Sequence, residues 1–276
     1  MLDRKLRGAL LALRVLGPRI VAREAVRRLI GLGYSYKGIR ITSSEDFWIL
    51  SAIAAKYKFY NEGGYVYVET PWALLRVPSN KFRLLTIMCE QVEEMYNQLD
   101  VENKVVIDIG AYIGETTLYF LSRGAKQVHA YEPVSEYYNI LLDNIRLNNA
   151  ENKVKAFNEG AWHREGRIII TESLTASGLD PQKGRSITIR VRSLASIIDY
   201  VASQGETVVK MDCEGCEYSI LATPCKTLQK ARQYLIEIHG APTPIIDYMM
   251  QCGFKPIYLG TVAEGLISIT LWLFNI

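Results

Sequence analysis

The run of residues from Val105 to Thr117 constrains the fold of this chain more than any other segment. It reads Val-Val-Ile-Asp-Ile-Gly-Ala-Tyr-Ile-Gly-Glu-Thr-Thr, so β-branched residues lead to Asp108 and glycines follow at positions 110 and 114. Helix-compatible residues continue to Leu121. This order predicts a buried strand, a glycine turn and a helix, the arrangement that brings a ligand close to backbone N–H groups in open α/β sheets. We therefore expect an α/β protein with a ligand site at this turn.

The spacing of the motif indicates which ligand the turn holds. It reads Asp-x-Gly-x-x-x-Gly and differs from the Gly-x-Gly-x-x-Gly of dinucleotide-binding folds. A carboxylate at the end of the first strand repels a pyrophosphate but suits a ligand with an ammonium or sulfonium group. We therefore expect S-adenosylmethionine as the cofactor. The loop residues predicted to bind it are Asp108, Gly110, Ala111, Tyr112, Gly114, Glu115 and Thr116.

A nucleoside cofactor also requires groups that bind its ribose and its base. The run 127–131 predicts a second strand that ends in an acid, Glu132, twenty-two residues after Gly110. An acid near this spacing accepts hydrogen bonds from ribose hydroxyls in Rossmann-type sheets. In a doubly wound sheet without a nucleoside site, tight packing would explain Gly110 but would not explain the acid at Glu132. A third strand, 154–157, is followed by polar groups suited to adenine. The residues predicted to contact the nucleoside are Glu132, Pro133, Asn158, Glu159 and Gly160.

A further block connects the chain to a family. Residues 210–217 read Lys-Met-Asp-Cys-Glu-Gly-Cys-Glu, with the pattern Lys-x-Asp-x-Glu-Gly-x-Glu. Together with residues 108–114 and Glu132-Pro133, this block resembles the FkbM-type S-adenosylmethionine-dependent methyltransferases, over roughly residues 60 to 276. The chain departs from the family's pattern at Ala195, where the family usually has Asp, and at Tyr112, where a smaller polar residue is frequent.

The resemblance implies a class I methyltransferase fold. This is a Rossmann-like α/β sheet of seven strands, mostly parallel, with a reversed edge strand. Strands four and five are expected at 207–211 and 234–238, and a final antiparallel pair at 254–258 and 267–274. Apolar runs at 167–171 and 186–191 predict an inserted hairpin around a polar loop, 174–185, which is a candidate substrate lid.

The first hundred residues predict an accessory region ahead of a methyltransferase domain spanning 101–276. Apolar residues at helical spacing indicate two basic amphipathic helices divided by Pro18. The remaining accessory elements are expected to be a helix at 47–56, a β-hairpin from runs 65–69 and 72–77, and a lead-in helix at about 81–98. The accessory region therefore contributes an N-terminal helical and β-hairpin extension to the fold.

Charge is unevenly distributed along the chain. Residues 1–40 carry ten Lys and Arg against Asp3 and Glu24, a balance of +8, whereas the whole chain carries only +3. A basic amphipathic helix can dock on its own protein, lie on an anionic membrane or contact nucleic acid. Docking is the commonest of these roles. Peripheral membrane contact through residues 1–32 is the next possibility, and nucleic acid is a less favoured partner.

Cysteine usage and hydropathy bear on the compartment. Five cysteines, an odd number without a regular framework, favour a reducing environment. Arg14 interrupts the only stretch resembling a signal-peptide core, and no apolar run approaches eighteen residues. We expect a cytoplasmic protein, or one peripheral to the membrane. Cys213 and Cys216 resemble a metal or redox pair, but small residues at a strand-to-helix corner explain them better, so no metal is predicted there. A divalent ion at the acids and histidine that follow strands four and five stays open, but carboxylates near a cationic ligand do not require one. These residues are Asp212, Glu214, Glu237 and His239.

Three residues are candidates for the chemistry of methyl transfer. A hydroxyl acceptor has to lose a proton, so a base near the ligand crevice is needed. Asp212 follows the fourth strand, Glu214 lies on the next loop, and His239 ends the fifth strand. Asp212 is equally suited to bind the methionine ammonium group. His239 has an alternative interpretation as a strand-end histidine whose hydrogen bonds are satisfied within the protein.

The function predicted from these features is O-methylation. The acceptor is expected to be a hydroxyl on a sugar, another polar small molecule or a glycoconjugate, and the hydroxyl preference comes from the family resemblance. No Asp-Pro-Pro-Tyr or Asn-Pro-Pro-Tyr segment, typical of enzymes that methylate exocyclic amines, follows the fourth strand. Two alternatives stay open. One is an RNA methyltransferase that uses the basic N-terminal arm, and the other is a non-catalytic S-adenosylmethionine-binding protein.

Overall fold

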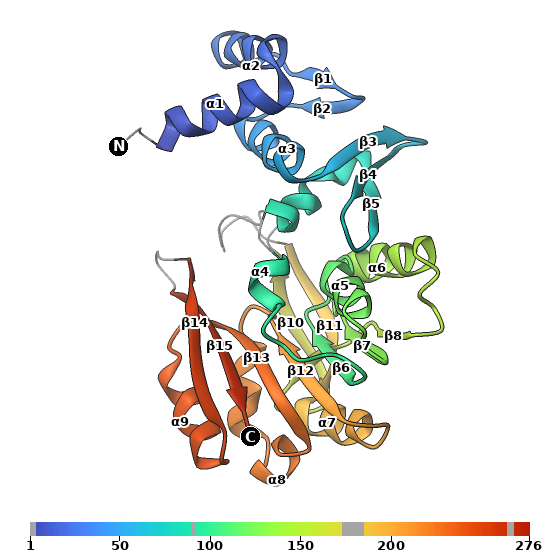
Figure 1. Cartoon of the computed structure of the whole chain (residues 1–276), viewed down its shortest axis with the longest axis vertical. Coiled ribbons are helices and arrows are strands. Elements are labelled where there is room, and N and C mark those ends of the chain that lie inside the picture. The colour runs from blue at the N-terminus through green and yellow to red at the C-terminus, as the bar shows by residue number, and fades with distance from the viewer. Residues whose placement is uncertain (1–3, 90–91, 173–184, 264–267) are drawn as a thin grey trace. The chain divides into compact units, whose positions relative to one another are not determined.

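Seven strands of the computed structural model form one sheet, in the order β14-β15-β13-β12-β6-β7-β8 (Figure 1). The structure describes residues 4–89, 92–172, 185–263 and 268–276. These residues divide into two units, one ending at Cys89 and the other beginning at Val92. The seven-stranded sheet belongs entirely to the second unit. The boundary near residue 100 between an accessory region and a catalytic domain stays a prediction.

The topology of this sheet confirms the predicted fold class. Strands β7, β6, β12 and β13 pair in parallel, as do β7 and β8, whereas β15 is antiparallel to both β13 and β14. The reversed strand is therefore β15, one position inside the edge strand β14. The strand bounds are β6 Val105–Ile109, β7 Gln127–Tyr131, β8 Val154–Phe157, β12 Thr207–Met211, β13 Ala231–His239, β14 Lys255–Ala263 and β15 Ile269–Asn275.

Helices cover both faces of the sheet, which is why its central strands are apolar on both sides. On one face, alternate residues of β6, β12 and β13 pack against α7 (Leu194–Ala202) and α9 (Thr243–Gln251). On the other face lie α5 (Glu115–Ser122) and α6 (Ser135–Leu147). All five residues of β6 and of β12 are buried. This rigid centre positions the loops that follow β6, β7 and β12.

A smaller sheet lies beside this core. The expected inserted hairpin is present as β10 (Gly166–Glu172) and β11 (Arg185–Ser193), paired antiparallel. A third strand, β9 (Gly160–Trp162), pairs in parallel with β11 and was not predicted. The candidate lid, residues 174–185, falls outside the described residues except for Arg185, where β11 begins.

The N-terminal unit contains the two predicted basic helices and the predicted hairpin. The hairpin gains an additional strand, β3, which pairs with β4. Helix α3 begins at a capping box formed by Ser43 and Asp46. The elements of this unit are α1 Arg4–Leu16, α2 Pro18–Ile30, β1 Tyr34–Tyr36, β2 Ile39–Ile41, α3 Ser44–Lys56, β3 Lys58–Glu62, β4 Tyr65–Glu69, β5 Leu74–Pro78 and η1 Ser79–Cys89.

The prediction of one lead-in helix over 81–98 is wrong. The structure has the 3₁₀ segment η1, with non-helical dihedrals at Lys81, and then a separate short helix, α4 (Val92–Tyr96). Three of the buried apolar residues of η1, Phe82, Leu85 and Met88, recur every three positions. Over so short a run this spacing fits both the three residues per turn of a 3₁₀-helix and the i, i+3 neighbours of an α-helix, so the pattern did not separate the two.

Four of the five cysteines form disulfides, which the sequence analysis did not predict. Cys213 pairs with Cys216, and Cys225 in α8 (Cys225–Leu228) pairs with Cys252 just after α9. Disulfides are frequent in oxidising compartments and in the intracellular proteins of hyperthermophiles. The cysteine count therefore no longer supports a reducing compartment. Among the described helices, none has the length and apolar character that crossing a membrane requires.

The two disulfides close loops of very different length, with sequence separations of 27 and 3 residues. Loop-closure entropy predicts a stabilisation of about 3.6 kcal/mol for Cys225–Cys252 and about 1.9 kcal/mol for Cys213–Cys216. We expect the Cys225→Ser/Cys252→Ser variant to lose more free energy of unfolding than Cys213→Ser/Cys216→Ser. Urea unfolding without reductant measures both losses, and equal losses would contradict the expectation.

Candidate active site

A buried ion pair joins the carboxyl ends of β6 and β12. The Nζ of Lys210 lies 3.2 Å from the Oδ1 of Asp108, and both side chains are almost completely buried. The same Nζ donates to the carbonyl oxygen of Gly110 at 2.7 Å. Asp108 Oδ2 accepts from the hydroxyls of Thr116 and Thr117, at 2.8 and 2.6 Å. Asp108 and Thr116 therefore connect the loop 110–114, called the glycine loop below, to α5, and the charge of Asp108 is balanced by Lys210.

The glycine loop passes very close to the end of β12. Gly110 has φ +75°, and a methyl group at its Cα would overlap the carbonyl oxygen of Asp212. The N–H groups of Gly110 and Ala111 both donate to the carbonyl oxygen of Tyr131, at 3.0 and 3.1 Å. A Cβ at Gly114 would lie 2.7 Å from a methyl group of Leu141. Glycine is required at position 110 because no side chain fits between the two loops.

Glu132 holds the loops after β6 and β7 together. Its Oε2 accepts from the backbone N–H of Tyr112 at 3.0 Å, and its Oε1 accepts from that of Val134 at 2.8 Å. Tyr112 itself has φ +47°, an uncommon conformation for a residue with a side chain. Each carboxylate oxygen keeps acceptor capacity beyond these bonds. The predicted ribose acceptor therefore lies beside the glycine loop.

The predicted adenine segment is organised by its own side chains. The Asn158 amide donates to the carbonyl oxygens of Glu132 and Pro133, at 2.9 and 3.1 Å. Glu159 forms ion pairs with Arg190 and Arg192 on β11, at 3.1 and 2.9 Å. A Cβ at Gly160 would lie 3.3 Å from the ring of Pro133. Asn158 and Gly160 thus adjoin the Glu132-Pro133 turn, whereas the carboxylate of Glu159 is directed to the small sheet.

The loop after β12 carries two of the predicted catalytic residues. Asp212 is partly buried, and its Oδ2 accepts from the hydroxyl of Tyr96 on α4 at 3.0 Å. Glu214 is exposed and has φ +53°. The Cys213–Cys216 disulfide encloses Glu214 and Gly215, so this four-residue loop is covalently closed. The two acids therefore lie on a loop whose shape is restrained.

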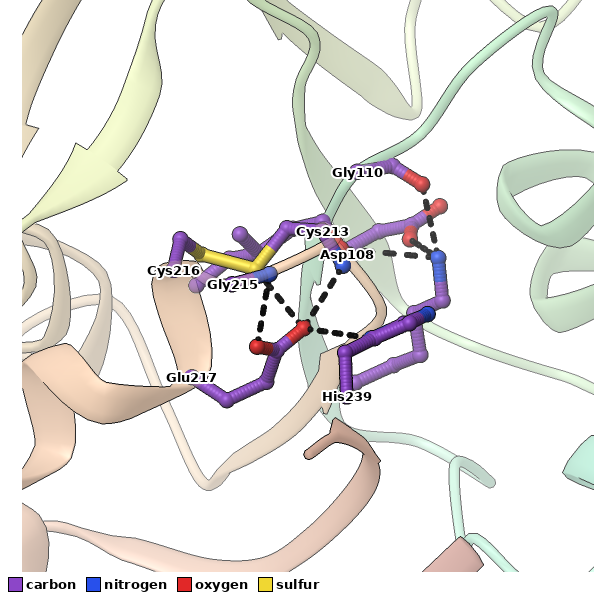
Figure 2. The surroundings of a disulfide bond; sticks show 9 residues. Asp108, Gly110, Cys213, Gly215, Cys216, Glu217 and His239 are labelled. Carbon is purple, nitrogen blue, oxygen red and sulfur yellow. Dashed lines mark hydrogen bonds and ion pairs between the residues drawn. A yellow bond between two sulfur atoms is a disulfide. The ribbon is translucent and has the colours of Figure 1, made fainter. Parts of the chain in front are cut away.

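Glu217 connects this loop to His239, as Figure 2 shows. Its Oε1 accepts from the N–H of Cys213 at 3.2 Å and lies 3.1 Å from His239 Nδ1, while its Oε2 accepts from the N–H of Gly215 at 2.8 Å. Burial lowers the pKa of His239, but the hydrogen bond to Glu217 and the charges of neighbouring carboxylates raise it to about 9. The third predicted catalytic residue is thus oriented by a fully buried acid.

Two buried acids lie near the glycine loop with strongly raised pKa values. Burial raises the pKa of Glu115 to about 8, against the lowering effect of Lys210. Burial likewise raises the pKa of Glu132 to about 8, although two backbone N–H groups lower it. Among the described residues, Glu115 Oε2 has no hydrogen-bond partner. A cationic ligand at this site would favour the ionised form of both acids, which fits a sulfonium cofactor carrying an ammonium group.

Three residues of the site were given no catalytic or binding role from the sequence. Lys210 and Glu217 belong to the Lys-x-Asp-x-Glu-Gly-x-Glu block, and their complete burial is the property that the pattern alone does not reveal. Tyr96 reaches Asp212 from a helix more than a hundred positions earlier. No signal in the sequence connects these two positions, because the contact depends on the tertiary fold.

The buried acids predict a dependence of stability on pH. Their ordinary pKa is 4.5 and their folded pKa is about 8, so the folded protein binds more protons between these values. The stabilisation that these two protonated acids contribute is therefore fully present below pH 4.5 and is lost as the pH rises through about 8. In ligand-free Glu115→Gln we expect the fall between about pH 5 and 8 to be smaller, by up to about 1.4 kcal/mol per pH unit, because the acid binds its extra proton only in this range.

Urea unfolding across this pH range measures the effect in both proteins. Glu151→Gln, a change at an exposed acid, is the matched control and should retain the full fall. An identical slope in Glu115→Gln and wild type would show that Glu115 does not bind a proton in the folded protein.

Comparison with known proteins gives one curated relative and several solved structures. The uncharacterized protein 158B of Sulfolobus islandicus rod-shaped virus 1 is 26% identical over 158 residues, covering 54% of this chain and 69% of the viral protein. The methyltransferase FkbM of Methylobacillus flagellatus KT is 17% identical with a TM-score of 0.47, covering 72% of this chain and 54% of that one. P. horikoshii TYW2 in complex with MeSAdo is 14% identical with a TM-score of 0.47, covering 78% and 72%.

A family model provides the decisive match. The methyltransferase FkbM domain matches residues 108–256, more than half of the chain. This range begins at Asp108 and includes Glu132, Asp212 and His239. It therefore contains the glycine loop, the predicted ribose acceptor and the restrained loop after β12. The chain belongs to the FkbM methyltransferase family and is an S-adenosylmethionine-dependent methyltransferase.

Proposed function

We propose that this protein transfers the methyl group to a hydroxyl of a sugar, another polar small molecule or a glycoconjugate. The observation that carries the proposal is the cluster of carboxylates beside the glycine loop, where Asp212 and Glu214 follow β12 directly. An alcohol has to lose its proton as the new bond forms, so an acceptor of this kind needs such groups. The cofactor supplies a methyl group on a sulfonium: the C–S bond breaks with its electron pair left on sulfur, and a C–O bond forms.

The residues around the glycine loop are proposed to hold the cofactor. Glu132 accepts hydrogen bonds from the ribose hydroxyls, and the backbone near Asn158 and Gly160 contacts the adenine. Glu115 and Asp212 are the acids closest to the charged methionine end, because Glu115 lies at the start of α5 and Asp212 beside Gly110. Asp108 acts indirectly, since its oxygens are already engaged by Lys210 and two threonines.

The proton of the acceptor is proposed to go to Asp212 or Glu214. His239 is a poorer base at neutral pH because its pKa is raised to about 9 and it already carries a proton there. It instead contacts Glu217, which accepts hydrogen bonds from the N–H groups of Cys213 and Gly215 and so holds the loop that carries both acids in place. His239 is therefore a positioning or ligand-binding residue in this scheme.

The experiment is a transfer assay with methyl-labelled S-adenosylmethionine, using pools of sugars and glycosides beside pools of amines. We expect label in hydroxyl acceptors, as ethers that resist alkaline hydrolysis. Glu132→Ala should lose transfer and bind S-adenosylhomocysteine at least about tenfold more weakly by calorimetry, because one good hydrogen-bonding site for ribose is removed. The exposed Glu151→Ala should behave as wild type.

Other results of this assay favour other functions. Label in amines or in RNA would contradict hydroxyl transfer. Normal binding of S-adenosylhomocysteine without transfer to any acceptor would support a non-catalytic binding protein. No binding by a folded sample would remove the basis of the residue assignments made here.

We also propose that α1 and α2 contact an anionic membrane surface. Part of each helix is buried within the N-terminal unit, through Ala12, Leu16 and Ile20. Large apolar side chains nevertheless stay exposed beside the basic residues. They are Leu10, Leu11, Leu13, Val26, Leu29, Ile30 and Leu32, of which Leu29 is 85% exposed. Apolar side chains next to Arg and Lys match the two components of a negatively charged lipid surface.

Vesicle flotation tests this contact. We expect binding to phosphatidylcholine vesicles only when phosphatidylserine is included, and loss of binding at high salt, because each basic residue contributes about 1 kcal/mol through charge. The variant Leu29→Asn/Ile30→Asn/Leu32→Asn should not float, whereas Ile169→Asn, at an exposed apolar residue of the other unit, should. Salt-sensitive binding to RNA that the triple variant loses, without vesicle binding, would instead favour a nucleic-acid partner.

A further inference from the structure

Three side chains with metal-binding atoms meet at the carboxyl ends of β12 and β13. Asp212 follows β12, and Glu237 and His239 lie at the end of β13. A carboxylate oxygen from each acid and a ring nitrogen of the histidine all lie within 4.8 Å of one another. In an octahedral Mg²⁺ or Mn²⁺ site with bonds of about 2.1 Å, ligand atoms lie about 3 to 4.2 Å apart. Small side-chain adjustments would therefore bring all three atoms onto one ion.

The imidazole of His239 already has the orientation of a metal ligand. Its Nδ1 lies 3.1 Å from Glu217, whose two oxygens are fixed by the N–H groups of Cys213 and Gly215. Its Nε2 is on the side of Glu237, 3.6 Å from Oε1. A carboxylate that accepts the Nδ1–H of a histidine is the usual outer partner of a metal-binding imidazole, and it leaves Nε2 as the ligand atom once the ion has displaced the proton there. Glu217 supplies that partner from outside the three ligands.

The carboxylates around His239 concentrate negative charge at the same place. Glu217 Oε1 lies 3.1 Å from Nδ1, and Glu237 Oε1 lies 3.6 Å from Nε2. Glu217 and Glu237 are 0% and 6% exposed. A carboxylate oxygen of Asp212 lies within 4.8 Å of the ligand atoms of Glu237 and His239. These carboxylates would attract a divalent ion to the point where the three ligand atoms converge.

We propose that Asp212, Glu237 and His239 bind a divalent cation of the Mg²⁺ or Mn²⁺ class. Two carboxylates and one imidazole suit these ions, whereas metals that prefer thiolates would lack ligands because Cys213 and Cys216 are joined in a disulfide. Three protein ligands leave coordination positions open for oxygen atoms of a second molecule. The site lies at the carboxyl edge of the sheet, where open α/β sheets bind their ligands.

This inference rests on the proposed hydroxyl transfer and narrows its acceptor. An acceptor with two neighbouring oxygens, such as a vicinal diol, would chelate the ion, and coordination lowers the pKa of the bound hydroxyl. The hydroxyl proton then passes to Glu214 or to water, the oxygen forms the C–O bond, and the C–S bond breaks with its electron pair left on sulfur. The ion keeps its charge and its oxidation state throughout.

Titration with MnCl₂ tests the site without any assay of activity. Full-length protein is first freed of metal with EDTA, and free Mn²⁺ is then followed by electron paramagnetic resonance. We expect one saturable site, with affinity reduced at least about tenfold in Asp212→Asn and Glu237→Gln and about 10- to 100-fold in Glu217→Gln. Glu206→Gln, which is at the opposite end of β12 in an exposed ion pair, should bind Mn²⁺ as wild type does.

Far-UV circular dichroism and thermal unfolding of the same samples show that each variant is folded, because Asp212 is itself proposed to contact the cofactor. The transfer assay with the wild-type protein then separates the two proposals. Absent Mn²⁺ binding, or equal binding by wild type and all the ligand variants, overturns the metal site while methyl transfer stands. Because Asp212 is only partly buried, Asp212→Asn gives this answer even if Glu237→Gln fails to fold. Mn²⁺ binding that follows the variants, without transfer to any hydroxyl, overturns the proposed function while the metal site stands.

Discussion

The burial of one ammonium group, that of Lys210, determines how the site is arranged. Lys210 is 1% exposed, and a charge so deeply buried costs several kcal/mol unless it is paired and hydrogen-bonded. Asp108 provides the pairing and the Gly110 carbonyl oxygen a hydrogen bond. The ends of β6 and β12 therefore have to stay in register, and this keeps the glycine loop next to Asp212. Threonines 116 and 117 extend the same network into α5.

Most of the methyltransferase sheet could be predicted from the sequence. Strands such as β6 and β12 are short, β-branched and bounded by turn residues, so their limits follow from composition. The segment from Ser79 to Cys89 could not be predicted in this way, because its apolar residues fit two helical periods about equally over so short a run. Strands β3 and β9 were missed because pairing with a neighbour, and not their own pattern, makes them strands.

Site residues could be predicted from the sequence only where their residue type and spacing indicate a chemical role. Glu132 was identified through its spacing from Gly110, and the structure places it beside the same loop. Glu159 has the residue type of a ligand-binding acid, yet the structure pairs it with two arginines of β11. The Cys225–Cys252 disulfide joins positions 27 apart, and nothing local indicates such a partner. Burial and tertiary partners decide these cases, and a single sequence records neither directly.

The close approach of Gly110 to the carbonyl oxygen of Asp212 leaves no space between the glycine loop and the loop that follows β12. Two backbones in such contact cannot shift independently, so a displacement of one is transmitted to the other. With the cofactor and the acceptor bound at the two loops as proposed, occupancy of one site would be thermodynamically linked to occupancy of the other. If bound cofactor changes the affinity for the acceptor by some factor, bound acceptor changes the affinity for the cofactor by the same factor. The absence of a side chain at Gly110 would in this way couple cofactor binding to acceptor binding.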